Sequence, residues 1–132
     1  MIIIHAKGNS ELGIGNLSRS YELIKYLSAK MNTIGIFECD EELFQRYKNK
    51  NILRSNNLQE SLNYIRKYNC SIYISDLVNP DKSLSDELRN IGITYILHFN
   101  NINHGFEPDI LFVTDNFDYE FSDTRFRIYR GF

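Results

Sequence analysis

The residues best suited to chemistry form a polar loop with several glycines, from Gly8 to Asn16. Its last two glycines, Gly13 and Gly15, stand one residue apart and directly before an expected helix. Glycines there let backbone amides approach an anion closely, and the helix dipole adds to the attraction. A tight turn and close helix packing need the same residue type. The loop is therefore either an anion-binding loop or a structural turn.

The loop does not match the common nucleotide-binding patterns. The third glycine of the dinucleotide-binding fingerprint would fall at Ser18, and no lysine follows as in the P-loop. We therefore expect no bound cofactor.

Two charged residues could complete a site at this loop. Arg19 lies one turn into the expected first helix, where it could reach a phosphate or pair with Glu11 or Glu22. Asp76 ends an expected buried strand, the position beyond which open parallel sheets hold their ligands. A carboxylate there serves as a ligand group or as a helix cap. We predict that Arg19 and Asp76 lie beside the ligand.

The histidines and cysteines lack the spacing of a metal site. His5 lies in the first expected strand, His98 and His104 flank the loop after the fifth, and none has a paired ligand nearby. Imidazoles that are satisfied in the core or that face solvent fit this pattern better, so we expect no metal. Cys39 and Cys70 are expected to be free, buried thiols.

These residues are positioned by short apolar runs that alternate with segments of helical period, a pattern typical of parallel sheets with crossover helices. Expected strands cover 2–6, 33–37, 51–54, 71–75, 94–97 and 109–113, and 125–132 suits an edge strand or an extended tail. Helices are expected from 16 to about 30, after Asp40, after Asn57 and before Gly92. We predict one three-layer α/β, Rossmann-like domain over residues 1–132, with a mainly parallel sheet.

Composition excludes several classes of partner. Fifteen Lys and Arg against 17 Asp and Glu give a formal net charge of -2, without the basic excess of a protein that tracks nucleic acid. The apolar start, residues 1–4, is too short for a signal peptide, and no stretch approaches the roughly 20 apolar residues of a membrane helix. We expect a cytoplasmic protein with no nucleic-acid or membrane partner.

The end of the loop and the start of the helix resemble a known motif, since they read Gly13-Ile14-Gly15-Asn16-Leu17-Ser18-Arg19. This run is similar to the Gly-x-Gly-His-x-x-Arg motif of the UDP-sugar hydrolases of pseudaminic-acid biosynthesis, in the GT-B glycosyltransferase superfamily. Later segments follow in a similar order: a strand ending at Asp76, Asn100-Asn101 where the family has two aspartates, and the segments 108–113 and 127–132. Only the glycine motif is specific.

The resemblance implies the amino-terminal half of a GT-B fold that handles a UDP-linked amino sugar in bacterial surface-glycan biosynthesis. With strands one and four adjacent in a doubly wound sheet, residues 13–16, 76–77 and 98–101 would share one rim. The expected ligand-binding residues are Gly13, Gly15, Asn16, Arg19, Asp76, Asn100 and Asn101. A rim that is only polar and solvated is the alternative.

Two departures from the family argue against autonomous catalysis. The motif histidine, taken to activate water in the family, is Asn16 here, and an amide cannot act as a general base at neutral pH. We expect Asn16 to cap the first helix, and we assign no catalytic residue. The family's nucleotide-binding second domain would begin where this chain ends. The chain is then a hydrolase- or glycosyltransferase-like domain, alone or cut from a longer enzyme, or else a non-catalytic ligand-binding or subunit-interaction module.

The carboxyl-terminal segment, 117–132, contains six aromatic residues. Contiguous apolar surface of this kind commonly marks a partner surface. We expect the segment to fold back on the sheet or to bind another subunit, either in a homodimer or with a separate nucleotide-binding chain.

Overall fold

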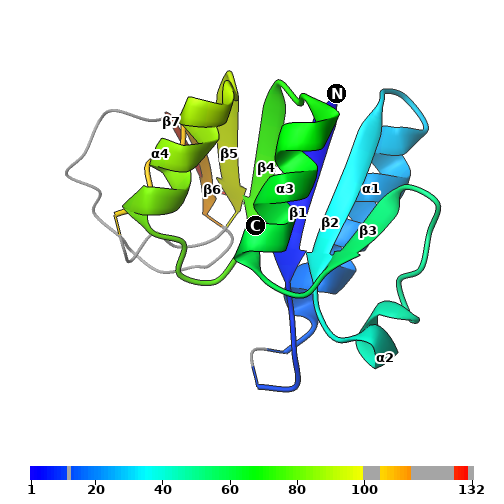
Figure 1. Cartoon of the computed structure of the whole chain (residues 1–132). Coiled ribbons are helices and arrows are strands. Elements are labelled where there is room, and N and C mark those ends of the chain that lie inside the picture. Colours follow the sequence, from blue (N-terminus) through cyan, green and yellow to red (C-terminus); the bar gives the residue numbers. More distant parts are fainter. Residues whose placement is uncertain (12, 100–104, 114–126, 131–132) are drawn as a thin grey trace.

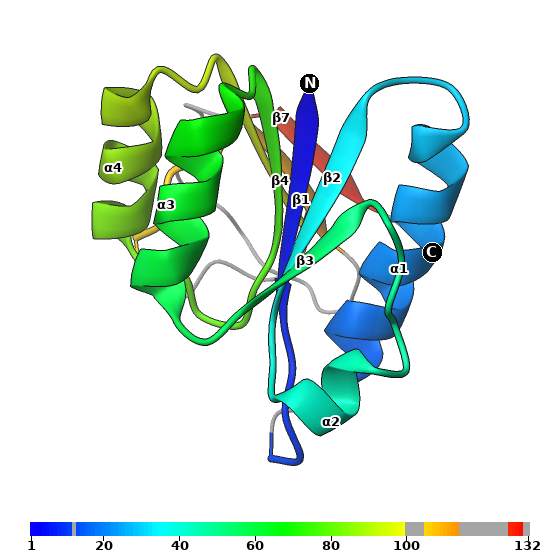
Figure 2. The same ribbon diagram turned by 45° about the vertical axis from the view of Figure 1, so that its right-hand side comes forward.

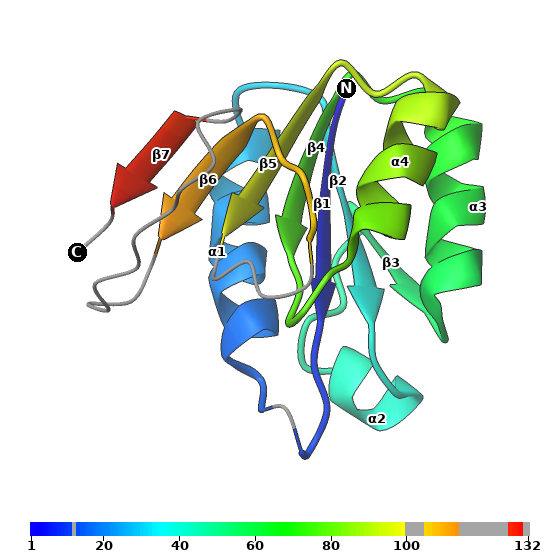
Figure 3. The same cartoon turned by 90° about the vertical axis from the view of Figure 1, so that its left-hand side faces the viewer.

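The computed structural model describes residues 1–11, 13–99, 105–113 and 127–130. In this part of the chain, the strands form one seven-stranded sheet in the order β3-β2-β1-β4-β5-β6-β7 (Figure 3). All six neighbouring pairs are parallel. The strands are β1 (Ile2–Lys7), β2 (Thr33–Glu38), β3 (Ile52–Ser55), β4 (Ile72–Asp76), β5 (Tyr95–Phe99), β6 (Ile110–Val113) and β7 (Arg127–Arg130).

The helices form a layer on each face of the sheet. Helix α1 (Gly15–Ser28) covers one face, and α3 (Leu58–Tyr68) and α4 (Lys82–Ile91) cover the other (Figure 2). The short α2 (Glu41–Phe44) lies near the carboxyl ends of the strands, at the bottom of Figure 1. The predicted three-layer, Rossmann-like α/β fold is therefore confirmed.

Both faces of the sheet are buried because side chains alternate along each strand. In β1, Ile3 belongs to the core under α3 and α4, whereas Ile2, Ile4 and Ala6 belong to the core under α1. Leu62 and Ile65 of α3 join the first core, and Leu17 and Ile24 of α1 join the second. The near-continuous apolar runs of the strands follow from this double burial.

The predicted helix ends are formed mostly as expected. The Asp40 carboxylate caps α2, and Asn57 Oδ1 accepts the Glu60 N–H at 2.9 Å at the start of α3. Glu60 returns a bond to the N–H of Asn56, one residue before the position that a capping box would use. Gly92 ends α4 with a φ of 102°, a left-handed conformation that favours glycine.

The winding of the sheet reverses between β1 and β4, as predicted. From β1 the chain steps outward through β2 to β3, and from β4 it steps the other way through β5 and β6 to β7. The carboxyl ends of the parallel strands lie at one edge of the sheet. We call it the carboxyl edge, and the described residues that follow β1, β2, β3 and β4 there are 8–11, 13–14, 39–40, 56–57 and 77–80. A ligand-binding site of this fold is therefore expected at the carboxyl edge.

The helices in the described part of the chain lack the length and the apolar content of a membrane-spanning segment.

Candidate functional site

The loop after β1 closes on itself as a tight turn. The Asn9 N–H donates to the Gly13 carbonyl at 3.3 Å, and the Gly13 N–H donates to the Asn9 carbonyl at 2.8 Å. Gly13 has a φ of 84°, which a residue with a side chain rarely adopts. The Gly13 amide is thus committed to the turn, and the amides left for an anion begin at Ile14.

Gly15 differs from the other loop glycines because the fold does not require it. It is the first residue of α1, and a Cβ built on it would meet nothing within 4 Å. At Gly8, by contrast, a Cβ would lie 2.7 Å from Leu17 Cδ1. The first intrahelical bond runs from the Ser18 N–H to the Ile14 carbonyl at 2.9 Å, so the amides before Ser18 lie at the open end of the helix. Gly15 leaves space for a ligand to approach these amides.

A bidentate ion pair joins α1 to the end of β4. Arg19 donates from Nε to Asp76 Oδ2 at 2.8 Å and from Nη2 to Asp76 Oδ1 at 2.6 Å. Ser20 Oγ donates to Oδ2 at 3.3 Å. The Asp76 side chain is only 2% exposed, whereas that of Arg19 is 41% exposed. Asp76 therefore holds and orients the guanidinium, and Arg19 is the member of the pair that reaches solvent.

Asn16 does not cap the first helix, so this prediction is wrong. The helix begins one residue earlier, at Gly15, with Ile14 as the capping residue and no side-chain capping bond. Asn16 consequently lies inside the first turn, on the same face as a residue three positions later. Its Oδ1 accepts from Arg19 Nη2 at 3.2 Å.

The structure brings four of the predicted site residues to one place and leaves two outside the description. Gly15, Asn16, Arg19 and Asp76 meet where α1 starts beside the end of β4. Gly13 lies just before them and serves the turn. Asn100 and Asn101 lie outside the described residues, so their predicted role stays a prediction.

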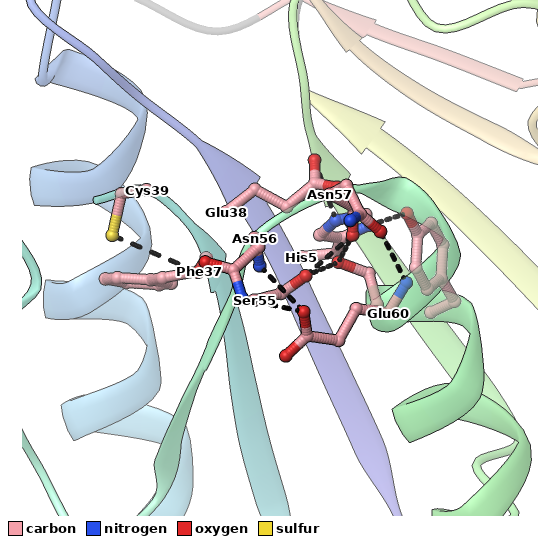
Figure 4. A network of polar contacts seen from close by, with 10 residues as sticks. His5, Phe37, Glu38, Cys39, Ser55, Asn56, Asn57 and Glu60 are labelled. Atoms are coloured by element: carbon pink, nitrogen blue, oxygen red, sulfur yellow. Dashed lines mark hydrogen bonds and ion pairs between the residues drawn. The ribbon is translucent and has the colours of Figure 1, made fainter. Parts of the chain in front are cut away.

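Sequence reasoning missed a buried polar network across β2, β1 and β4 (Figure 4). His5 Nδ1 lies 2.6 Å from the Tyr73 hydroxyl, and His5 Nε2 lies 3.5 Å from Glu38 Oε2. His5 and Tyr73 are fully buried, and Glu38 is 5% exposed. Glu38 could have indicated this network from the sequence, since it is a charged residue at the end of an apolar strand.

The surroundings of Glu38 and Tyr73 shift the pKa values of both side chains. Burial alone would raise the pKa of the Glu38 carboxyl, but the hydrogen bond and charge of His5, with Lys7 and the Ser61 hydroxyl, lower that pKa overall. Burial raises the pKa of the Tyr73 hydroxyl well above its usual value. Glu38 is therefore a carboxylate at neutral pH, and Tyr73 keeps its proton.

A pocket of about 310 Å³ opens at the carboxyl ends of β1, β2 and β3. We call it the β1–β3 pocket, and its lining residues are Lys7, Gly8, Asn9, Glu38, Cys39, Asp40, Arg54 and Asn56. A second pocket of about 250 Å³ shares Asp40 and reaches Ser10 and Ile14. The two pockets therefore lie on either side of Asp40, one beside Glu38 and the other beside Ile14, the residue that precedes α1.

The cysteines are free and buried, as predicted. Burial raises the pKa of both Cys39 and Cys70 to about 11, so both are protonated thiols at neutral pH. Within the described ranges, no group of three or more His, Cys, Asp or Glu side chains is placed to hold a metal ion.

No family model, curated protein or solved structure matches this chain. The arrangement of its own residues must therefore carry any proposal about function. The likeness of residues 13–19 to the UDP-sugar hydrolase motif remains a resemblance of sequence.

Proposed function

We propose that this chain is a hydrolase- or glycosyltransferase-like domain that binds a nucleotide sugar of the UDP-amino-sugar class and has no catalytic activity of its own. The observation that carries the proposal is the Arg19–Asp76 pair beside the first amides of α1. The ligand would lie at the carboxyl edge, where β1 and β4 meet.

The geometry of this pair suits a diphosphate. A bidentate carboxylate fixes the plane of the Arg19 guanidinium, which lowers the entropy lost when a phosphate binds. The open amides from Gly15 onward lie one turn away in the same helix, and helix amino termini attract anions. Because Asp76 offsets the charge of Arg19, binding would rest on hydrogen bonds more than on net charge, and salt would weaken it only modestly.

The absence of activity follows from Asn16. This residue stands in the position of the family's histidine, and its amide cannot accept a proton at neutral pH. Both described histidines, His5 and His98, are fully buried, so neither substitutes as a base at the rim. Binding without hydrolysis is the outcome that these residues support.

A thermal-shift experiment tests the binding proposal. UDP-N-acetylglucosamine and UDP should raise the unfolding midpoint of the purified chain, because a ligand of the native state stabilises it by mass action. Gly15→Val should abolish the increase, since its side chain would occupy the approach to the amides. Glu22→Val, which places the same new side chain at an exposed position of α1, serves as the control. An unchanged midpoint at millimolar ligand would contradict the proposal.

Release of UDP tests the second half of the proposal. The chain should release UDP from UDP-N-acetylglucosamine no faster than buffer does. A rate above background that Gly15→Val removes would show that the chain is an enzyme.

A subunit-interaction role is the second candidate, and an aromatic row favours it. Phe99 of β5 stacks on Phe112 of β6 with ring centroids 4.8 Å apart, and Phe112 stacks on Tyr129 of β7 at 5.4 Å. Tyr129 is 49% exposed. Self-association measured by light scattering, and its loss in Tyr129→Ser, would support a homodimer through residues 117–132. A monomer at high concentration would leave a separate nucleotide-binding subunit as the partner to seek.

A further inference from the structure

The β1–β3 pocket has a mixed and balanced set of charges. Lys7 and Arg54 supply two cations, and Glu38 and Asp40 supply two carboxylates. Several of these groups are already engaged. Asp40 accepts the Leu43 N–H at 2.7 Å, and Arg54 donates from Nη2 to Asn56 Oδ1 at 2.8 Å.

Glu38 is the lining residue with an unused acceptor. His5 lies against Oε2, but Oε1 is buried and has no hydrogen-bond partner among the described residues. The Ser61 hydroxyl lies near the carboxylate, but its one proton also has acceptors in Ser55 Oγ at 2.8 Å and the Asn57 carbonyl at 3.2 Å. A buried acceptor without a donor destabilises the folded chain, so a hydrogen-bond donor from the adjacent pocket would remove that cost.

We propose that the β1–β3 pocket binds a vicinal diol through the carboxylate of Glu38. A phosphate only accepts hydrogen bonds, so Glu38 and Asp40 would repel it. An ammonium group only donates, so Lys7 and Arg54 would repel it. A neutral pair of adjacent hydroxyls donates to Glu38 Oε1 and accepts from Lys7, so it satisfies both signs of the lining.

His5 and Tyr73 are the positioning residues for this carboxylate. The Tyr73 hydroxyl fixes the His5 ring at Nδ1, and the opposite nitrogen faces Glu38 Oε2. In Figure 4, Glu38 and His5 point toward each other from neighbouring strands, with the turn from Ser55 to Asn57 on the same side. The network thus places the imidazole beside Oε2 of Glu38 and not beside Oε1.

The size and place of the pocket indicate one ring of a larger ligand. Its volume of about 310 Å³ is at the lower end of ligand pockets, which span roughly 300–1,000 Å³. The neighbouring pocket shares Asp40 with it and is also lined by Ile14, the residue before α1. This inference rests on the proposed function: the diol is that of the ribose or of the hexose, with the diphosphate at α1.

Small probes separate the two sources of the diol. Amide chemical shifts of the ¹⁵N-labelled chain should move at residues 8–9, 38–40 and 54–56 with either uridine or N-acetylglucosamine. The probe that moves them identifies the ring. The matched analogue, 2′,3′-dideoxyuridine or 3-deoxy-N-acetylglucosamine, should bind about tenfold more weakly, because hydrogen bonds to a charged group are lost.

A variant tests the assigned residue itself. Glu38→Gln should weaken binding of the active probe about tenfold, whereas Glu22→Gln, on the exposed face of α1, should leave it unchanged. Equal affinities of probe and deoxy analogue for the wild-type chain would overturn the inference even if Glu38→Gln fails to fold. Shifts confined to residues 14–19 and 76–79 with UDP-N-acetylglucosamine would overturn it while sparing the proposed function. No shifts with any ligand would overturn both.

Discussion

Two buried carboxylates lie at the carboxyl edge, and they differ in how completely the protein satisfies them. Asp76 receives two bonds from Arg19 and one from Ser20, so both of its oxygens are partnered. Glu38 is paired with His5 through one oxygen, and the other has no hydrogen-bond partner among the described residues. Asp76 is an internal support for Arg19, whereas Glu38 is an acceptor that lines a pocket.

The difference shows that burial at a ligand edge does not by itself make a carboxylate a ligand group. Asp76 lies at the reversal of winding, where sheet topology predicts a ligand. Both of its oxygens, however, already accept hydrogen bonds from Arg19 and Ser20 within the protein. Glu38 lies one strand further out, on β2, and its Oε1 can still accept a hydrogen bond. The hydrogen-bond partners of each carboxylate oxygen therefore decide whether the residue supports the fold or can bind a ligand.

Loss of Arg19 should have the largest effect on stability. Arg19→Met leaves the Asp76 carboxylate buried without its cation, and removal of one partner of a buried ion pair costs about 3 kcal/mol of unfolding free energy at the lower end of the usual range. Urea denaturation measures the change. Lys25→Met, which removes an exposed ion pair with Glu22, is the control and should change stability by less than about 1 kcal/mol. Equal effects of the two variants would mean that Asp76 finds another partner.

Gly8→Ala should be the next most damaging change. The new Cβ would lie 2.7 Å from Leu17 Cδ1 and 3.0 Å from the Gly13 carbonyl oxygen, so α1 or the turn must shift. Overpacking of this kind costs about 1–3 kcal/mol, measured by the same denaturation. An unchanged unfolding free energy in Gly8→Ala would show instead that the turn or α1 shifts easily to admit the methyl group.

Glu38 should make stability depend on acid pH. Its pKa is lower in the folded chain than the usual 4.5, so its contribution is complete above that value and is lost as pH falls through the folded pKa. The wild-type chain should therefore lose more unfolding free energy between pH 6 and pH 3 than Glu38→Gln does. Parallel losses in the two proteins would contradict the pairing of Glu38 with His5.

Gly15→Ala should have the smallest effect on stability and the opposite sign. Its backbone is helical and nothing lies within 4 Å of the added Cβ, so alanine should stabilise the chain by about 0.4–1 kcal/mol. The same change should weaken binding of UDP-N-acetylglucosamine, because the methyl group narrows the approach to the helix amides. Higher stability with unchanged affinity would make Gly15 a residue without a binding role.

The fold could be predicted from sequence because local patterns determine it. Alternation along β1 assigns Ile3 to one core and Ile4 to the other, and right-handed crossovers place β4 beside β1. The position of Asp76 followed from the same rule. These inferences need only the order of elements along the chain.

The polar contacts could not be predicted because they depend on register and on single dihedral angles. His5 meets Tyr73 only because β1 and β4 pair with Ile3 opposite Tyr73 and His5 opposite Ser75, two residues along. Asn16 loses its predicted capping role because Gly15 adopts helical angles, which moves the helix start by one residue. Neither feature leaves a periodic pattern in the sequence.

A titration of the ¹⁵N-labelled chain with UDP-N-acetylglucosamine, followed by amide chemical shifts, tests whether the carboxyl edge binds a nucleotide sugar. We expect movement at residues 14–19 and 76–79 at the start of α1, and at 8–9, 38–40 and 54–56 around Glu38, all with one dissociation constant. Scattered movement, or none at millimolar ligand, would contradict the claim that the carboxyl edge binds a nucleotide sugar.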